Sequence, residues 1–355
     1  MPRRPAVASP STSYDRVIVI DGLGFPGGMK TDWHHPLTPA QVGHLRQSGL
    51  TCTHLTVGSV GTVPALRAFA DIMRSIAFWE SQIDAHPQAL LPIRRAADIN
   101  RAEKEARTGL VYGLQDGVSF ETDLDRLPVM HQFGIRVIQP TYNRRNLLGD
   151  GCMEPSDAGL SRTGHQAIEV MNELGILVDL SHCGRRTAAD AIAISTKPIA
   201  FTHTGCAAVI EHPRHRSDQE LRAVADKGGV VGIYVMPYLA GGRQPEAADV
   251  IRHLEHAIDV AGEDHVSIGT DGTISPTELT DEYRKKFADN IRERRESGIA
   301  APGETETGYL FAADLNTPRR LETLATMLLA RGHSQGRVDK ILGRNLLRVF
   351  AATWR

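Results

Sequence analysis

Two histidines follow neighbouring apolar segments, at positions where they could bind one metal ion. His182 closely follows the apolar run 175–180, and His203 directly follows the run 198–202. The two positions are 21 residues apart, about one strand–helix repeat, so adjacent parallel strands would place them side by side. Neutral imidazole is the commonest metal ligand, and two histidines form half of a zinc site. A single histidine would more simply end a strand by hydrogen bonding, but the matched spacing favours a metal site.

Three further polar residues follow apolar runs in the same way. Asp271 stands in the segment Gly269-Thr270-Asp271-Gly272, where its carboxylate could bind a metal or accept a proton. The alternative is an ordinary turn aspartate beside a glycine. Gln115 and Tyr142 also follow such runs, and the Gln115 oxygen is a further candidate metal ligand. All these residues would meet at one mouth if the runs are parallel strands.

Two loops carry candidate substrate ligands. Arg214 lies after the run 198–202, and a guanidinium there suits a carboxylate group. The alternative is a solvated basic loop. Tyr142 and Asn143 begin a polar loop with hydrogen-bond donors for an oxyanion or a substrate, although a structural, salt-bridged loop would look alike.

The elements that must position these residues form a regular series. Eight short apolar runs, rich in β-branched residues, alternate with stretches of helical length: 17–20, 52–57, 109–114, 134–139, 175–180, 198–202, 228–235 and 266–269. This alternation predicts an α/β fold, a (β/α)8 TIM barrel with extra C-terminal helices. A doubly wound open sheet is the alternative, but no G-x-G-x-x-G motif follows the first run.

Helix signals support the series. The segments 121–133, 161–174, 187–195 and 217–227 are amphipathic, and Ser217 with Glu220 forms a capping-box pattern. A strongly charged helix is expected at 281–296, then a Gly/Pro-containing loop at 300–306 and two closing helices at 318–331 and 335–350.

Composition narrows the class of protein. The chain has 355 residues, of which 41% are hydrophobic, and 40 basic residues stand against 42 acidic ones. That balance argues against a nucleic-acid partner, and no apolar run approaches the roughly 18 residues of a membrane span. We expect a flexible leader at 1–13, one domain at 14–355 and a cytoplasmic location. Export stays an alternative because of Arg3 and Arg4, although no apolar segment follows them. A homodimer is a further expectation.

Several motifs, in this order, resemble the membrane (renal-type) dipeptidases of the amidohydrolase superfamily. They run from Leu177-Val178-Asp179-Leu180-Ser181-His182 through Phe201-Thr202-His203-Thr204, His212-Pro213-Arg214 and Gly269-Thr270-Asp271-Gly272 to Gly343-Arg344-Asn345-Leu346. The resemblance implies a (β/α)8 barrel and a two-zinc centre. It also implies that Arg214 binds the substrate carboxylate and that Asp271 is the aspartate that the family has after strand eight.

The ligand pattern of that family is only partly present. Leu23 and Phe25 stand where the family has a His-x-Asp pair, and Gln115 replaces the bridging glutamate. Tyr142 replaces a substrate-polarising histidine. What remains suits one zinc ion, held by His182, His203 and an oxygen of Asp271 or Gln115. Should two zinc ions bind, Asp21, His34 and His35 would be the first further ligands to consider.

These residues predict a dipeptidase-like, metal-dependent amidohydrolase. Its substrate would be a small amide with a free carboxylate, such as a dipeptide or a modified amino acid. Zinc at His182 and His203 would activate water, Asp271 would carry its proton, and Tyr142 would donate to the developing oxyanion. Arg214 and Asn143 would bind the substrate. The alternative is an inactive barrel that acts as a binding or accessory protein for a carboxylate ligand.

Overall fold

A computed structural model describes residues 13–27, 35–61 and 63–354. The predicted leader at 1–13 therefore lies outside the described residues except for Ser13, which begins the short 3-10 helix Ser13–Arg16. His34 also lies outside them. Within the described part, no helix is both long enough and apolar enough to cross a membrane.

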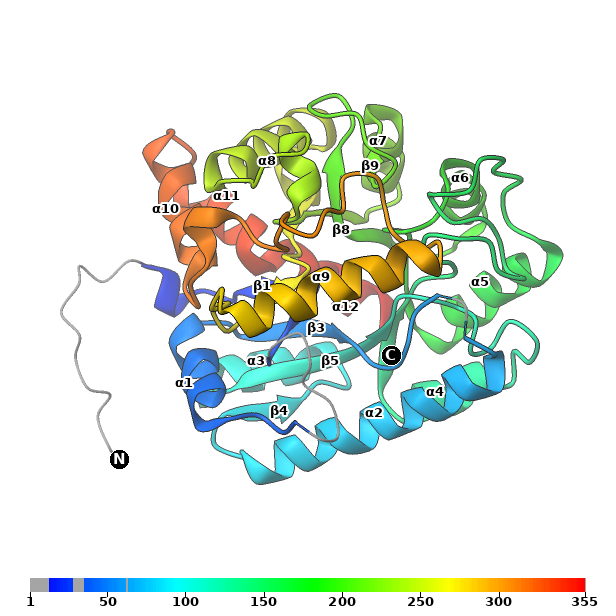
Figure 1. The fold of residues 1–355 in the computed structure, drawn as a ribbon, viewed down its shortest axis with the longest axis horizontal. Coiled ribbons are helices and arrows are strands. Elements are labelled where there is room, and N and C mark those ends of the chain that lie inside the picture. Colours follow the sequence, from blue (N-terminus) through cyan, green and yellow to red (C-terminus); the bar gives the residue numbers. More distant parts are fainter. Residues whose placement is uncertain (1–12, 28–34, 62, 355) are drawn as a thin grey trace.

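Eight parallel strands form the predicted barrel (Figure 1). Each predicted apolar run overlaps one of them, although β8 extends four residues beyond its run, and the order of pairing follows the chain. The eight are β1 (Ile20–Asp21), β3 (Cys52–Thr56), β5 (Thr108–Leu114), β6 (Ile135–Ile138), β7 (Leu177–Asp179), β8 (Ile199–Cys206), β10 (Val230–Ile233) and β11 (Val266–Ile268).

The first and last strands close the barrel. The Gly22 backbone donates a hydrogen bond to the Ile268 carbonyl at 2.8 Å. Just beyond, the short strands β2 (Gly24–Phe25) and β12 (Gly272–Thr273) pair in parallel. Two further short strands, β4 (Leu90–Pro92) and β9 (His215–Arg216), extend the sheet beside β5 and β8.

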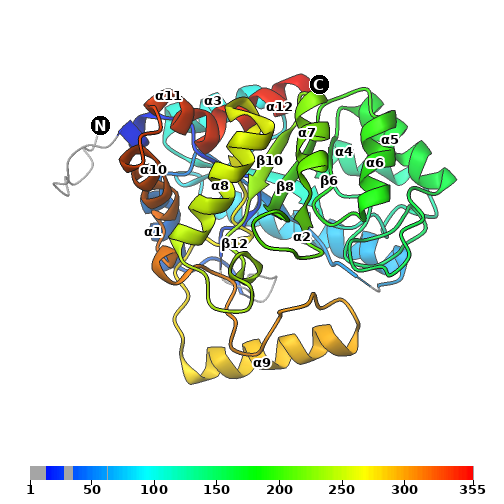
Figure 2. The ribbon, with the colours of Figure 1, turned by 90° about the horizontal axis from the view of Figure 1, so that it is seen from above.

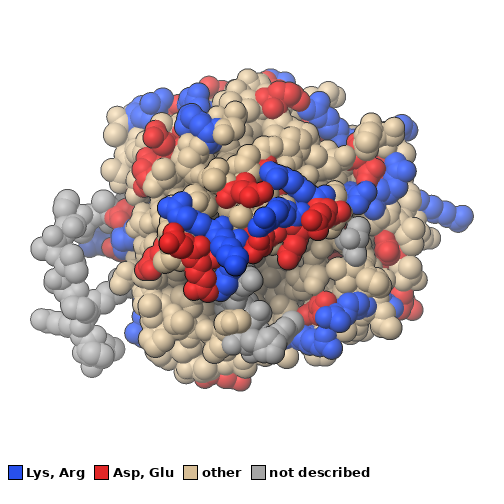
Figure 3. All heavy atoms as spheres, in the orientation of Figure 1, with Lys and Arg blue, Asp and Glu red and all other residues tan. Residues whose placement is uncertain are grey.

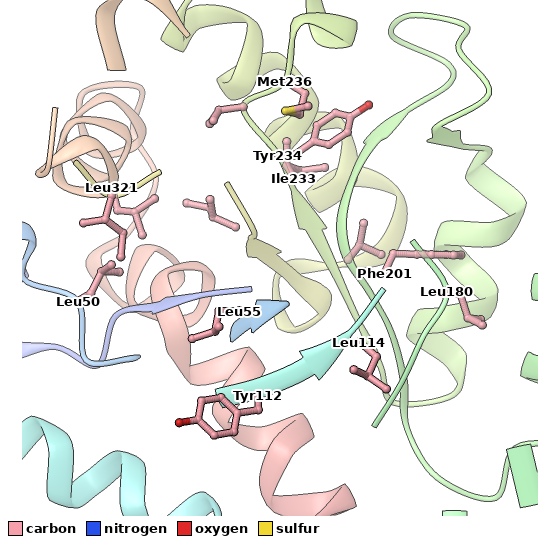
Figure 4. Close-up of a cluster of buried hydrophobic side chains, with 14 of the residues drawn as sticks. Leu50, Leu55, Tyr112, Leu114, Leu180, Phe201, Ile233, Tyr234, Met236 and Leu321 are labelled. Atoms are coloured by element: carbon pink, nitrogen blue, oxygen red, sulfur yellow. The ribbon is translucent and has the colours of Figure 1, made fainter. Parts of the chain in front are cut away.

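The main hydrophobic core lies between the strands and the surrounding helices. Figure 4 shows part of it, with outward-facing side chains such as Leu55, Tyr112, Leu114 and Phe201. The strands are buried on both faces, which explains their continuous apolar runs. The helices that pack on them are α1 (Pro39–Ser48), α2 (Ala65–Ala85), α3 (Ala96–Glu105), α4 (Arg126–Gln132), α5 (Arg162–Leu174), α6 (Arg185–Ile194), α7 (Asp218–Asp226), α8 (Ala247–Ala261) and α10 (Arg320–Ala330).

Most helix boundaries agree with the sequence signals. Ser217 caps α7, and the reciprocal bonds of its capping box with Glu220 are both present. Helix α5 is capped at its C-terminus by Gly175, whose φ of 76° is left-handed. The helix predicted at 121–133 begins later, at Arg126, because Asp123 and Asp125 form turns before it. The helix predicted at 318–331 likewise begins at Arg320.

The closing helices cover the end of the barrel where the strands begin. The segment predicted at 335–350 is α11 (Gln335–Asp339), a π-helical turn (Lys340–Arg344) and α12 (Asn345–Thr353). Phe350 and Trp354 stack at 4.1 Å and belong to a cluster with the first residues of several strands, such as Cys52 and Leu177.

A separate element lies at the opposite end of the barrel, across the strand C-termini. It consists of α9 (Asp281–Glu296) and the returning segment 297–312, together called the flap here. Figure 2 shows α9 and α12 at opposite ends of the barrel. The flap has its own small hydrophobic cluster, made by Phe287, Ile291, Tyr309 and Phe311. Its position makes it part of the wall of any site at the strand ends.

Candidate active site

A cavity of about 640 Å³ opens at the C-terminal ends of the strands. It is bounded by the strand ends, by one face of α2 and by the flap, and Figure 3 shows the surface hollowed beside the charged residues of α9. Most of the residues predicted for the site line it: Gln115, Tyr142, Asn143, His182, Arg214 and Asp271. His203 lies behind His182 and is fully buried.

The two predicted metal-binding histidines face one another. Their Nε2 atoms are 3.1 Å apart. His182 Nδ1 lies 2.6 Å from the Asn143 side-chain oxygen, and since the amide nitrogen of Asn143 donates to Ile299 O, the ring nitrogen must be the donor. The Nε2 atom of His182 therefore carries a lone pair.

The same reasoning fixes the second ring. Thr202 donates its hydroxyl hydrogen to Asp179, so it accepts from His203 Nδ1 at 2.8 Å. Both Nε2 atoms are thus acceptors pointing at each other. Burial, with Arg214 nearby, holds the pKa of each imidazole well below its usual range, which keeps both rings neutral. Two facing lone pairs on neutral imidazoles are suited to share a cation.

Buried hydrogen bonds hold these rings in place. Asp179 at the end of β7 accepts bonds from the backbone and hydroxyl groups of Ser181 and Thr202. The Gln139 side chain accepts from the His182 backbone at 3.1 Å. Such partners behind a ligand orient its ring and fix its tautomer.

Tyr142 and Asn143 lie on the other side of His182. The Tyr142 ring stacks on His182 at 4.1 Å, and burial raises the pKa of its phenol, which keeps it a donor. Asn143 lines the cavity, but its amide is already bonded to His182 and to Ile299 O. The structure therefore gives Asn143 a positioning function, and its binding of substrate stays a prediction.

Arg214 and Asp271 supply the charges of the cavity centre. Arg214 is 2% exposed and donates to the carbonyls of Ser181 and His203, while no described carboxylate lies within ion-pair distance. Burial raises the pKa of Asp271 to about 7, although Arg214 and Arg294 oppose the rise. Asp271 also has a left-handed backbone, with φ 53°.

The described residues supply a facing pair of histidines rather than a complete set of metal ligands. No group of three or more His, Cys, Asp or Glu side chains in the described part could hold a metal. Leu23 is fully buried and Phe25 lines the cavity, and neither can bind a cation. Gln115 donates to Thr56 at 2.7 Å, which leaves its oxygen as the remaining neutral candidate.

Asp21 is not a spare ligand. Its two oxygens accept from the backbone and the hydroxyl of Thr270 at 2.7 and 2.6 Å and from the Leu23 backbone at 3.2 Å. Burial raises the pKa of Asp21 to about 6. These bonds join β1 to the end of β11, so Asp21 has a structural function. His35 lies on an exposed segment.

The flap contributes a residue to the site that the sequence did not predict. Arg294 lines the cavity and lies against Tyr142, while Glu304 holds it through bonds of 2.7 and 2.8 Å. The available signal was the spacing of Tyr283, Phe287 and Ile291 on one helical face, which Arg294 continues. Nothing in the sequence indicated that this face covers the strand ends.

Comparison with known proteins identifies the family. The family described as membrane dipeptidase (peptidase family M19) matches residues 34–294. This chain belongs to that family. A Klebsiella pneumoniae protein, described as a protein in the pqqA 5' region, is similar to this chain. The two are 30% identical over 286 residues, which cover 77% of this chain and 93% of the Klebsiella protein.

Other relatives carry enzyme names. Dipeptidase verJ of Clonostachys rogersoniana is 26% identical over 280 residues, covering 78% of this chain and 64% of its own length. A solved amidohydrolase from Pseudomonas aeruginosa has a TM-score of 0.81 and 30% identity, covering 96% of this chain and 98% of that chain. A Rhodobacter sphaeroides metallo peptidase, with a TM-score of 0.77 and 20% identity over 95% of this chain and 99% of its own, shares the fold. The chain thus has a barrel of the membrane dipeptidase family.

Proposed function

We propose that the protein is a metal-dependent amidohydrolase that binds one zinc ion and cleaves a small amide bearing a free carboxylate. The supporting observation is the pair of Nε2 lone pairs of His182 and His203, 3.1 Å apart at the bottom of a cavity that also contains Asp271 and Arg214. Membership of a dipeptidase family supports the class of reaction.

Each residue has a defined task in this proposal. His182 and His203 would hold the zinc, which when bound acts as a Lewis acid and lowers the pKa of water. Asp271 takes a proton from the attacking water and passes it to the leaving amine. Tyr142 donates a hydrogen bond to the developing oxyanion, and Arg214 pairs with the substrate carboxylate.

Metal content tests this proposal directly. Zinc titrated into the metal-free protein, followed by calorimetry, should bind at one site per chain. His203→Ala should lose that site, whereas His165→Ala, on the outer helix α5, should keep it. Two tightly bound zinc ions per chain would contradict the single site.

The alternative is a barrel that binds a carboxylate ligand without hydrolysing it. The observation in its favour is that Leu23 and Phe25 cannot bind a metal and that Gln115 is uncharged. No zinc binding, together with ligand binding that depends on Arg214, would support this alternative.

A further inference from the structure

The cavity extends well beyond the polar centre. Residues of α2 that face it are spaced along one side of the helix, and the flap lies opposite. Its volume of about 640 Å³ lies within the usual range for small-molecule sites, roughly 300–1,000 Å³. A ligand held at Arg214 therefore has room for a second, large group.

That second part of the cavity is largely apolar. On the flap, Ile291 and Phe311 belong to its hydrophobic cluster, and Leu310 packs against that cluster. Phe78 and Trp79 of α2 form an edge-to-face aromatic pair. These five side chains and Phe25 line the cavity and are called the apolar wall here. Burial of an aromatic group against such a wall is favourable.

Two of the three described carboxylates that line the cavity are already held in ion pairs. Asp71 pairs with Arg67 at 2.9 Å, and Glu304 is held by Arg294. Among the described lining residues, Asp271 is the one remaining carboxylate, and it faces Arg214 and Arg294. A substrate ammonium group in this cavity would meet two guanidinium groups. Its one acidic partner would be Asp271, whose carboxylate the proposed reaction already uses as the proton acceptor. A buried charge without a partner is costly.

We propose that the apolar wall accepts an uncharged acyl group of aromatic size, so that the substrates are N-acylated amino acids rather than dipeptides with a free ammonium group. This inference rests on the proposed function for the identity of the scissile amide. The acyl group would lie between α2 and the flap, and the carboxylate of the amino acid would pair with Arg214.

Two ligands that differ by one group test the inference. 3-Phenylpropionyl-alanine and phenylalanyl-alanine share the same skeleton, and only the second carries an α-ammonium group. At pH 6.5 that amine, whose pKa is about 7.7–8.0, is charged. Calorimetry on metal-free protein should give a Kd at least tenfold lower for the acyl compound, and acetyl-alanine should bind at least tenfold more weakly than the phenylpropionyl compound. Equal or tighter binding of the dipeptide would overturn the inference, as would no binding of either aromatic ligand.

A matched pair of variants tests whether the preference for an uncharged acyl group arises at the apolar wall. Leu310 is half-buried on the flap and lines the cavity. Leu310→Asp supplies a carboxylate, and Leu310→Asn is the uncharged control of the same shape. Relative to Leu310→Asn, the aspartate variant should shift the ratio of the two Kd values at least tenfold toward the dipeptide. The same ratio in both variants, each checked for cooperative unfolding, would contradict the location.

Hydrolysis of the same compounds by zinc-loaded protein separates the two proposals. Selective binding of the acyl compound without turnover would contradict the proposed function and support this inference. Turnover of phenylalanyl-alanine with a kcat/KM equal to that of 3-phenylpropionyl-alanine would support the function and overturn this inference.

Discussion

At the scale of single residues, a substitution of Arg214 distinguishes substrate binding from the chemical step. Its buried guanidinium is held by backbone carbonyls of Ser181 and His203 and faces the cavity. Lysine cannot reproduce the fork that pairs with a carboxylate. Because a hydrogen bond to a charged group contributes about 1.5–3 kcal/mol, we expect Arg214→Lys to lower kcat/KM by about 10- to 150-fold.

The control for this prediction is a substrate with its carboxylate amidated. It should already be poor and lose little more in Arg214→Lys, and zinc content should be unchanged. His203→Ala should instead remove the metal and abolish turnover of both substrates. Equal losses for carboxylate and amide substrates would show that Arg214 acts structurally.

The raised pKa of Asp271 predicts that both activity and stability depend on pH. Burial raises its pKa to about 7, and only the carboxylate form can accept a proton. We therefore expect kcat/KM to rise with pH through about 7, or at lower pH if bound zinc stabilises the carboxylate. The pKa in the unfolded chain is lower, so this group favours the folded state less as pH rises from about 4 to 7.

Asp271→Asn tests both effects, because asparagine tolerates the left-handed backbone at φ 53°. The variant should be inactive. Denaturant unfolding should show its stability improving relative to the original protein between pH 5 and pH 8. A constant difference in unfolding free energy over that range would argue against a raised pKa.

The individual residues also show how far the sequence could define the site. His182, His203 and Asp271 could be found because each follows an apolar run of the sequence, and strand ends converge in a barrel. In the structure β8 continues to Cys206, so His203 lies within that strand. The position of Arg294 could not be found, since it depends on where a charged helix folds back. For Asn143 the sequence indicated a donor near the site, but its bond to His182 became apparent only from the structure.

At the scale of elements, the strands were predictable and the flap was not. Strands buried on both faces have continuous apolar runs, which the sequence displays directly. The flap buries few residues, and its contacts join segments far apart in the chain, such as Asn143 and Ile299. The charged composition of α9 is that of an ordinary exposed helix, so the sequence did not indicate that the flap lies over the cavity.

Glu304 should control how firmly the flap is attached. It accepts bonds from Arg294, from the Tyr238 hydroxyl at 2.9 Å and from the Ala301 backbone. Since the flap has its own cluster, Glu304→Gln should loosen this element more than the barrel. Hydrogen exchange should become faster in α9 and unchanged in strands such as β8.

The matched control for this variant is Glu306→Gln. Glu306 pairs with Arg295 at 3.6 Å, and both side chains are about half exposed. Exposed pairs contribute roughly 0–1 kcal/mol, so this change should leave exchange in α9 almost unaffected. Similar exchange rates in both variants would mean that Glu304 does not hold the flap.

For the whole molecule, the two ends of the barrel have different tasks. The end where the strands begin is closed by apolar side chains of α12, whereas the opposite end carries the cavity and the charged flap. This division follows from the direction of parallel strands, because all C-termini lie at one end. Changes at the closed end should therefore alter stability without altering the chemistry.

Phe350→Ala tests that separation. Phe350 is 1% exposed, stacks on Trp354 and packs against the strand starts. Removal of a buried phenylalanine leaves a cavity and costs about 3–5 kcal/mol. The free energy of unfolding in denaturant should fall by about that amount. Leu347→Ala, at a partly buried position beside the same cluster, should cost less.

The activity of Phe350→Ala should stay unchanged under conditions where the variant remains folded. Phe350 belongs to α12, and Figure 2 shows α12 at the end of the barrel opposite α9. Zinc affinity should likewise be the same. The bonds that orient His182 and His203 come from Gln139 and Asn143, which follow β6, and from Thr202 of β8, which is itself bonded to Asp179 of β7. A lower zinc affinity in the folded variant would mean that packing at the closed end reaches the histidines through the strands. The barrel would then transmit strain along its full length, and the two ends would not be independent.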